Sequence, residues 1–211
     1  MNRISLFWAP ASPFVRKVMV CAHELGFADR IDILESAANP IERDARIQEF
    51  NPLAKVPAAR ASDGTVLYDS RVICEYLDTL KASESGPDAL QLFPPAGPER
   101  WTALRRQALA DGLVDAALLV RYEILLRPEN LRWSAWIEKQ SEKIVDAVDD
   151  MLADLPAPET LDIGTVSYAC ALGWLDFRFP DLDWRSGRTP LAAWYASYEA
   201  RPAMIATQPR S

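Results

Sequence analysis

The spacing of apolar residues changes near residue 98, and this change limits the possible folds more than any single motif does. Before it, short strand-like runs alternate with amphipathic helices, and after it only helical spacing occurs. Residues 81–98 between the two parts are rich in Pro, Gly and Ser, as is typical of a linker. With 211 residues the chain is long enough for two small domains. We predict an α/β domain over residues 1–80, a linker over 81–98 and an all-helical domain over 99–211.

The first part begins with a strand over residues 4–8, followed by a helix. Pro13 lies in the first turn of this helix and Gly26 ends it. Arg16 and Lys17 fall opposite the apolar stripe, so we expect them to face away from the core. The stripe itself consists of Val15, Val18, Ala22 and Leu25.

The rest of the first part continues the alternation. A strand is expected over 31–34, a short helix after Pro40 as far as Ile47, two strands over 56–60 and 65–68, and a helix that Ser70 caps. The order is strand, helix, strand, helix, two strands and a helix, which describes a small α/β layer with a mixed sheet.

The second part has helical spacing throughout. Four helices are expected, over residues 101–120, 133–155, 166–177 and from 189 to just before 202. The third is apolar all round, so it should lie at the centre of a bundle.

Composition excludes several classes of protein. Lys and Arg number 23 against 30 Asp and Glu, and the net charge of −7 argues against a nucleic-acid binder while leaving room for a local positive pocket that takes a small anion. Three distant cysteines without a C-x-x-C argue against a disulfide framework and a zinc site, so no metal is expected. No apolar run is long enough for a membrane span or a signal peptide, so we expect a cytoplasmic protein without a membrane partner.

Three short segments carry the candidate chemistry, each at an end of an expected element: Ser12-Pro13, residues 51–57 and Asp69-Ser70. Two of them open helices, whose N-termini present unpaired N–H groups and partial positive charge to an anion. The third, Asn-Pro-Leu-Ala-Lys-Val-Pro, ends in a proline that is able to adopt the cis form and leave the backbone of Val56 free to pair with a peptide. Taken singly, each segment also has an ordinary structural reading. Ser12 and Ser70 would be helix caps, and residues 51–57 would be a loop.

Together, the segments Ser12 to Val18, Asn51 to Pro57 and Asp69 to Leu77 resemble the glutathione S-transferase family, in its bacterial type with serine at the activating position. The linker and the helical second half fit the family plan as well. The resemblance implies a thioredoxin-like domain joined to an all-α domain, a homodimer, and glutathione as co-substrate.

The resemblance also implies roles for single residues. Val56, before the cis-proline Pro57, would pair with the cysteinyl backbone of glutathione, and Ser70 would bind the glutamyl carboxylate with Asp69 near the ammonium group. Lys55 would reach a glutathione carboxylate, and Phe14 belongs to the same expected site.

Ser12 is the expected activating residue, because a hydroxyl that donates to sulfur, next to a helix N-terminus, lowers the pKa of a thiol. Its other role is to cap the helix. The family's tyrosine variant has no candidate, since Trp8 occupies the aromatic position. The cysteine variant is missing too, since Cys21 lies about two and a half turns past Ser12.

The resemblance places a hydrophobic electrophile against the first long helix, with Arg105, Asp111, Asp115 and Tyr122 as candidate wall residues. Buried capping or interdomain ion pairs are at least as good a reading of these positions. The family often has Ser/Thr-x-x-Asp capping its central helix, and here Asp162 and Thr165 stand in the reverse order. We expect capping by Asp162 to persist and the return bond from Thr165 to be weaker.

The expected function is conjugation of the glutathione thiolate to a small electrophile, as in detoxification. Two alternatives stay open: a glutathione-binding or protein-interaction module with little turnover, and a glutathione-dependent peroxidase.

Overall fold

The computed structural model describes residues 3–86 and 88–210. Residues 1, 2, 87 and 211, at the edges of the expected domains and inside the expected linker, lie outside the described residues. The chain forms two compact units, one that runs to Ala96 and includes the segment from Arg201 onward, and one that spans Gly97–Ala200. The last residues, expected in the helical domain, therefore belong with the first unit.

The first unit contains a four-stranded mixed sheet in the order β2-β1-β3-β4. Strand β1 pairs in parallel with β2 and antiparallel with β3, and β3 pairs antiparallel with β4. The expected order of elements is confirmed. The strands are β1 (Ile4–Trp8), β2 (Ile31–Glu35), β3 (Ala58–Ala61) and β4 (Val66–Leu67).

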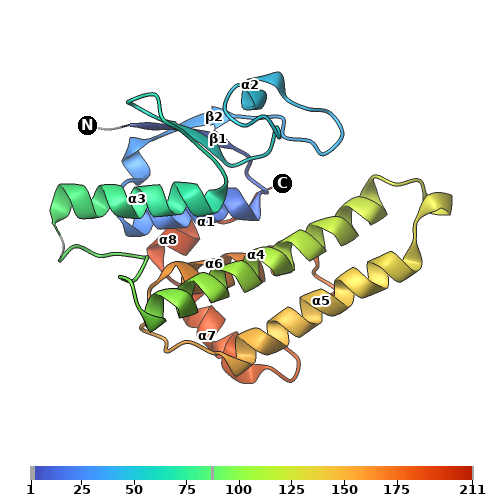
Figure 1. The fold of residues 1–211 in the computed structure, drawn as a ribbon. Coiled ribbons are helices and arrows are strands. Elements are labelled where there is room, and N and C mark those ends of the chain that lie inside the picture. Colours follow the sequence, from blue (N-terminus) through green and yellow to red (C-terminus); the bar gives the residue numbers. More distant parts are fainter. Residues whose placement is uncertain (1–2, 87, 211) are drawn as a thin grey trace. The chain divides into compact units, whose positions relative to one another are not determined.

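Helices cover both faces of this sheet (Figure 1). Helices α1 (Pro13–Glu24) and α3 (Ser70–Ser85) pack side by side on one face, and the short α2 (Ala45–Gln48) lies on the other. Under α2, Phe7 and Phe50 meet edge to face with their ring centroids 4.9 Å apart, in a cluster with Ile47 and Ala58. Helix α2 begins later than expected because the Asp44 carboxylate caps it, accepting from the Arg46 N–H at 2.9 Å.

The polar side of α1 differs from expectation. Its apolar stripe is buried as predicted, but Arg16 and Lys17 are also buried, at 5% and 1% exposed. For Arg16 the cause is a helix that was not predicted from the sequence, α8 (Pro202–Ala206), which packs on α1. Arg16 donates from Nη2 to the carbonyl oxygen of Met204 at 3.3 Å. Apolar periodicity predicts one buried face of a helix, and a second element then covers the polar face.

The expected linker is partly helical and anchored. Helix α3 continues to Ser85, and the chain then runs along the first unit. The Asp78 carboxylate on α3 accepts from the backbone N–H groups of Leu92 and Phe93, and all three residues are buried. The Pro-rich segment is therefore anchored to α3 by hydrogen bonds at Leu92 and Phe93.

The second unit is all-helical, as predicted. Almost every residue of its helix α6 is buried, from Ile163 to Leu175, so the prediction of a central helix is confirmed. Helices α5 and α6 both pack against α4. The unit consists of α4 (Pro98–Leu125), η2 (Glu129–Leu131), α5 (Ser134–Ala153), α6 (Ile163–Arg178) and α7 (Thr189–Glu199).

A complete capping box opens α6. The Asp162 carboxylate accepts from the Thr165 N–H at 2.8 Å, and Thr165 Oγ1 accepts in return from the Asp162 N–H at 2.9 Å. The return bond, expected to be the weaker of the two, is present at nearly the same length, and the Thr165 side chain that makes it is buried. Tyr198 of α7 extends the network, with its hydroxyl 3.2 Å from Thr165 Oγ1.

Gly164, in the first turn of α6, allows close approach to α4. A Cβ at this position would lie 2.7 Å from Cβ of Arg106 and 2.8 Å from the carbonyl oxygen of Ala103. Neither atom is at the end of a flexible side chain, so the two helices would have to separate to admit it.

We expect Gly164→Ala to lower the free energy of unfolding by about 1–3 kcal/mol, because it overpacks this contact. Gly112→Ala is the matched control, since Gly112 is exposed in α4 and a Cβ added there would have no neighbouring atom within 4 Å. It should raise stability by about 0.5–1 kcal/mol through helix propensity alone. Urea unfolding followed by circular dichroism measures both, and equal effects of the two substitutions would contradict the close-contact argument.

Candidate functional site

Strand pairing brings the three candidate segments to one end of the sheet. Phe7 near the end of β1 pairs with Ala58 at the start of β3, and Ala59 pairs with Leu67 at the end of β4. The β1–α1 connection, the loop before β3 and the start of α3 therefore share this end (Figure 1). Two helix N-termini and one loop thus face the same region of the first unit.

Ser12 is the N-cap of α1. Its Oγ accepts from the Val15 N–H at 3.3 Å, and Pro13 occupies the first helical position. The side chain is half-buried. Within the described part of the chain its hydroxyl hydrogen has no acceptor. Because a capping hydroxyl uses only its lone pairs, the Ser12 O–H is free to donate to a ligand while the cap stays in place.

The loop before β3 is held by Asn51, a residue whose role the sequence analysis did not identify. Its buried amide donates to the Lys55 carbonyl oxygen at 3.0 Å and accepts from the Leu53 N–H at 3.0 Å. The signal was present, because Asn before Pro is a common turn former. The Val56–Pro57 peptide bond is cis, as the sequence allowed.

The exposure of the side chains decreases along residues 55–57. Pro57 is buried, Val56 is half-buried and Lys55 is exposed. No hydrogen bond among the described residues uses the backbone N–H or C=O of Val56. The backbone of Val56 is therefore available to an extended peptide at this end of the sheet.

Asp69, rather than Ser70, caps α3. The Asp69 carboxylate accepts from the Arg71 N–H at 3.0 Å, and Ser70 is the first helical residue. The prediction of Ser70 as the cap was wrong because the backbone of Asp69 is extended, as an N-cap requires, while Ser70 is already helical. Ser70 is only 2% exposed, and its hydroxyl has no hydrogen-bond partner among the residues that the structure describes. That hydroxyl is released from capping and lies at a helix N-terminus.

The electrostatics of this end of the sheet favour an anion at α1. Helix α1 has a neutral cap and no acidic residue in its first turn, so the partial positive charge of its N-terminus is not neutralised from within the helix. At α3 the capping carboxylate of Asp69 offsets part of that charge. Phe14 is half-buried in the first turn of α1, and its ring lies 5.7 Å from Nζ of Lys17. Asp69, which is exposed, is the acidic group beside Ser70.

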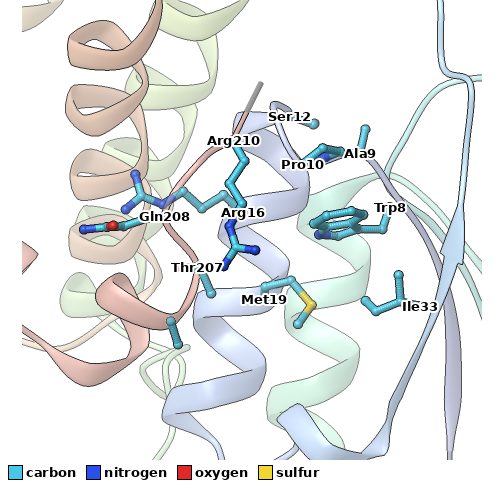
Figure 2. Close-up of a pocket in the computed structure, with 11 residues that line it drawn as sticks. Trp8, Ala9, Pro10, Ser12, Arg16, Met19, Ile33, Thr207, Gln208 and Arg210 are labelled. Atoms are coloured by element: carbon cyan, nitrogen blue, oxygen red, sulfur yellow. The ribbon is translucent and has the colours of Figure 1, made fainter.

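A pocket of about 210 Å³ adjoins Ser12 (Figure 2). Its walls come from the β1–α1 connection, α1, β2 and the C-terminal segment, all within the first unit. The presence of Arg16 in the pocket wall was not predicted, since Arg16 was expected to face away from the core. The residues that determine its chemistry are Trp8, Ser12, Arg16, Met19, Ile33 and Arg210.

The candidate wall residues lie on α4 of the second unit. Arg105 is committed to an ion pair inside that unit, with Nη2 2.7 Å from Oδ2 of Asp154. Asp111 is buried and Asp115 is exposed. Tyr122 is partly exposed, and burial of its ring raises the pKa of its hydroxyl above the ordinary value. The ion pair of Arg105 is partly exposed and lies within the second unit, so it is not the buried or interdomain pair that was the alternative reading.

Other kinds of site find no support in the described residues. They contain no group of three His, Cys, Asp or Glu residues placed to hold a metal ion. None of the described helices has the length and apolar character needed to cross a membrane. The three cysteines are buried, and none of them forms a disulfide with another described residue.

Comparisons with known proteins find one family in both parts of the chain. Residues 11–80 match the glutathione S-transferase N-terminal domain, and residues 107–197 match the glutathione S-transferase C-terminal domain. The GST-like protein YibF of Escherichia coli K12, described as uncharacterized, is 29% identical over 94% of this chain and 95% of its own length.

Solved structures are similar along the whole chain. A glutathione transferase family member from Pseudomonas fluorescens Pf-5 with bound glutathione is 45% identical, with a TM-score of 0.91 over 99% of this chain and all of its own. Another structure from this organism, with bound S-(propanoic acid)-glutathione, is 44% identical with a TM-score of 0.87 over 98% of this chain and all of its own. A glutathione S-transferase from Methylobacillus flagellatus KT with glutathione bound is 34% identical, with a TM-score of 0.84 over 98% of this chain and all of its own.

We expect Asp69→Ala to destabilise the protein by about 1 kcal/mol, because α3 loses its N-cap. Asp69→Asn should cost much less, since an amide oxygen is able to accept from the Arg71 N–H in the same way. Thermal unfolding of the two variants tests the assignment. If Ser70→Ala proved as costly as Asp69→Ala, Ser70 would be the cap after all.

Proposed function

Because the chain belongs to the glutathione S-transferase family, we propose that it binds glutathione at the shared end of its sheet and transfers the thiolate to a small electrophile. One observation carries the proposal. Ser12, Val56 and Ser70 each hold an unused hydrogen-bonding group, and strand pairing brings all three to that end. The glutathione-bound relatives support the choice of ligand.

Each part of glutathione has a proposed partner. The cysteinyl backbone pairs with the N–H and C=O of Val56, beside Pro57, as an added strand would. The glutamyl carboxylate binds the Ser70 hydroxyl and N–H at the start of α3. The ammonium group lies near Asp69, whose second carboxylate oxygen is free of the capping bond. Lys55 is exposed and carries the charge to meet a further carboxylate, and Phe14 flanks the ligand from α1.

Ser12 is the proposed activating group. A cysteine thiol has a pKa of about 8.5, so only a few per cent is thiolate at neutral pH. Donation from the Ser12 hydroxyl and the positive end of α1 both stabilise the charged sulfur and lower that pKa. The thiol proton leaves to solvent. In a substitution, the sulfur lone pair forms a C–S bond and the leaving group departs with its bonding electron pair. In an addition, sulfur bonds to one carbon of a double bond and the other carbon takes a proton from water.

The candidate wall residues of α4 rest on the family resemblance alone. Arg105 is given to its ion pair with Asp154, and Asp111, Asp115 and Tyr122 stay candidates on that ground only. A homodimer, a cytoplasmic location and a role in detoxification are proposed from the family alone.

The rival function is a glutathione-binding module with little turnover, and the capping bond of Ser12 favours it. If the Ser12 hydroxyl serves only as the helix cap, no residue of the described site acts on the sulfur. Substitutions that separate the cap from the hydroxyl distinguish the two functions.

We expect Ser12→Gly to lower kcat/KM by about 10- to 100-fold and to raise the pKa of bound glutathione, because the hydroxyl donor is lost. Glycine caps helices nearly as well as serine, to within a few tenths of a kcal/mol, so stability should hardly change. Ser12→Thr keeps both functions and is the control. The thiolate absorbance of bound glutathione as a function of pH gives its pKa. Turnover of 1-chloro-2,4-dinitrobenzene gives kcat/KM. Unchanged turnover in Ser12→Gly would leave the binding module as the better description.

We expect Asp69→Asn to weaken glutathione binding by about 10-fold, because it removes a charge from the ammonium subsite while leaving the α3 cap in place. Isothermal titration calorimetry measures the change. A binding constant equal to that of the wild type would exclude Asp69 from the site, whereas no glutathione binding by the wild-type protein would overturn the proposed function.

A further inference from the structure

The pocket beside Ser12 combines an apolar wall with concentrated positive charge. Trp8, Met19 and Ile33 form its apolar side, and Arg16 and Arg210 contribute the charge (Figure 2). The described residues that line it include no Asp or Glu. The charge of the pocket lining is therefore positive, while the net charge of the chain is −7.

Arg16 is the informative residue. It is only 5% exposed, its Nε has no hydrogen-bond partner, and its one side-chain hydrogen bond among the described residues runs from Nη2 to the Met204 carbonyl oxygen at 3.3 Å. A guanidinium group has five N–H donors, and burial of its charge without a counter-ion is unfavourable. The residues that the structure describes supply no carboxylate to Arg16.

Three other partly buried arginines of this chain each pair with a carboxylate, whereas Arg16 has none among residues 3–86 and 88–210. Arg106 pairs with Asp154 at 2.8 Å, Arg188 with Asp149 at 2.6 Å and Arg201 with Glu24 at 2.9 Å. Arg16 is more deeply buried than any of these three, and it faces a pocket instead of a carboxylate. A negatively charged ligand in the pocket would complete its pairing.

The position of this charge relative to the proposed reaction centre is fixed. Arg16 follows Ser12 by four residues, one helical turn, and its backbone N–H donates to the Ser12 carbonyl oxygen at 3.0 Å. Both residues line the pocket. A ligand held by Arg16 thus lies within one turn of α1 from the group proposed to activate the thiol.

We propose that this pocket selects the electrophile, and that the electrophile carries a carboxylate. Arg16 binds the carboxylate with Arg210 at the pocket mouth, while the apolar body of the compound packs on Trp8, Met19 and Ile33. The reacting carbon then points toward Ser12 and the glutathione sulfur. This inference rests on the proposed glutathione-transfer function and names its substrate class.

A matched pair of aryl chlorides tests the inference: 4-chloro-3-nitrobenzoate and 4-chloro-3-nitrobenzamide. In each reaction the thiolate forms a C–S bond at the chlorinated carbon, chloride leaves with the bonding electrons, and the thiol proton goes to solvent. The two compounds differ at the far end of the ring only, in a negative or a neutral group. We expect kcat/KM, divided by the uncatalysed rate constant, to favour the acid by at least about 10-fold.

Arginine variants assign that preference to the pocket. Arg16→Met keeps the aliphatic stem and removes the charge, and it should reduce the acid-to-amide ratio by about 10-fold. Arg210→Gln should reduce it by about 3-fold, and because Arg210 is exposed this variant keeps the test valid if Arg16→Met fails to fold. Arg30→Met is the control, since Arg30 belongs to the same unit, pairs with Glu84 and lies outside the pocket. Its ratio should equal that of the wild type.

A binding measurement separates this inference from the function on which it rests. Calorimetry compares the two thioether products, made chemically, with glutathione itself. If glutathione binds and both chlorides react with equal efficiency, the anionic substrate class is wrong and the transferase function stands. If Arg16→Met weakens glutathione and both products alike, the charge serves glutathione and the inference is overturned. If glutathione does not bind at all, the proposed function fails first.

Discussion

The antiparallel pairing of β3 with both of its neighbours determines where the candidate site forms. Strand β1 leads into α1, β4 leads into α3, and β3 starts directly after Pro57. With β3 reversed relative to the other two, its beginning meets their ends, and two helix N-termini converge on one loop. A parallel β3 would place Pro57 at the opposite end of the sheet. The polar groups of Ser12, Val56 and Ser70 would then have no common ligand.

The C-terminal segment completes the first unit and creates the pocket beside the site. Arg201 binds Glu24 of α1 with two hydrogen bonds of 2.9 Å, and the N–H of Arg210 donates to the Pro10 carbonyl oxygen at 3.3 Å. Between these attachments α8 covers the polar side of α1. Residues from both ends of the chain therefore line one pocket, and its chemistry depends on a segment far in sequence from Ser12.

The sequence predicted the local features and missed those that depend on a distant partner. Apolar spacing, Pro13 and Gly26 were sufficient for α1, because these signals act within a few residues. The burial of Arg16 was not predictable, since it requires α8, a five-residue helix too short for periodicity to reveal. The choice between Asp69 and Ser70 as cap also failed, because both residue types cap well and only the backbone geometry decides. For the candidate site, the sequence indicated the three segments that strand pairing brings together, but it gave no sign of the pocket beside them.

A net charge of −7 does not conflict with an anion-binding site, because the two act at different ranges. At physiological ionic strength the Debye length is about 8 Å, so distant surface carboxylates contribute little to the potential inside a pocket. Arg16 is buried, and solvent screens its charge far less than theirs. It also starts from α1 one turn after Ser12, and the backbone N–H of Arg16 donates to the Ser12 carbonyl oxygen. The charge that would orient an electrophile and the hydroxyl proposed to activate the thiol therefore start from one helix. If the proposed pocket selects the electrophile, a change of substrate class follows from changes on α1 or in the segment that covers it.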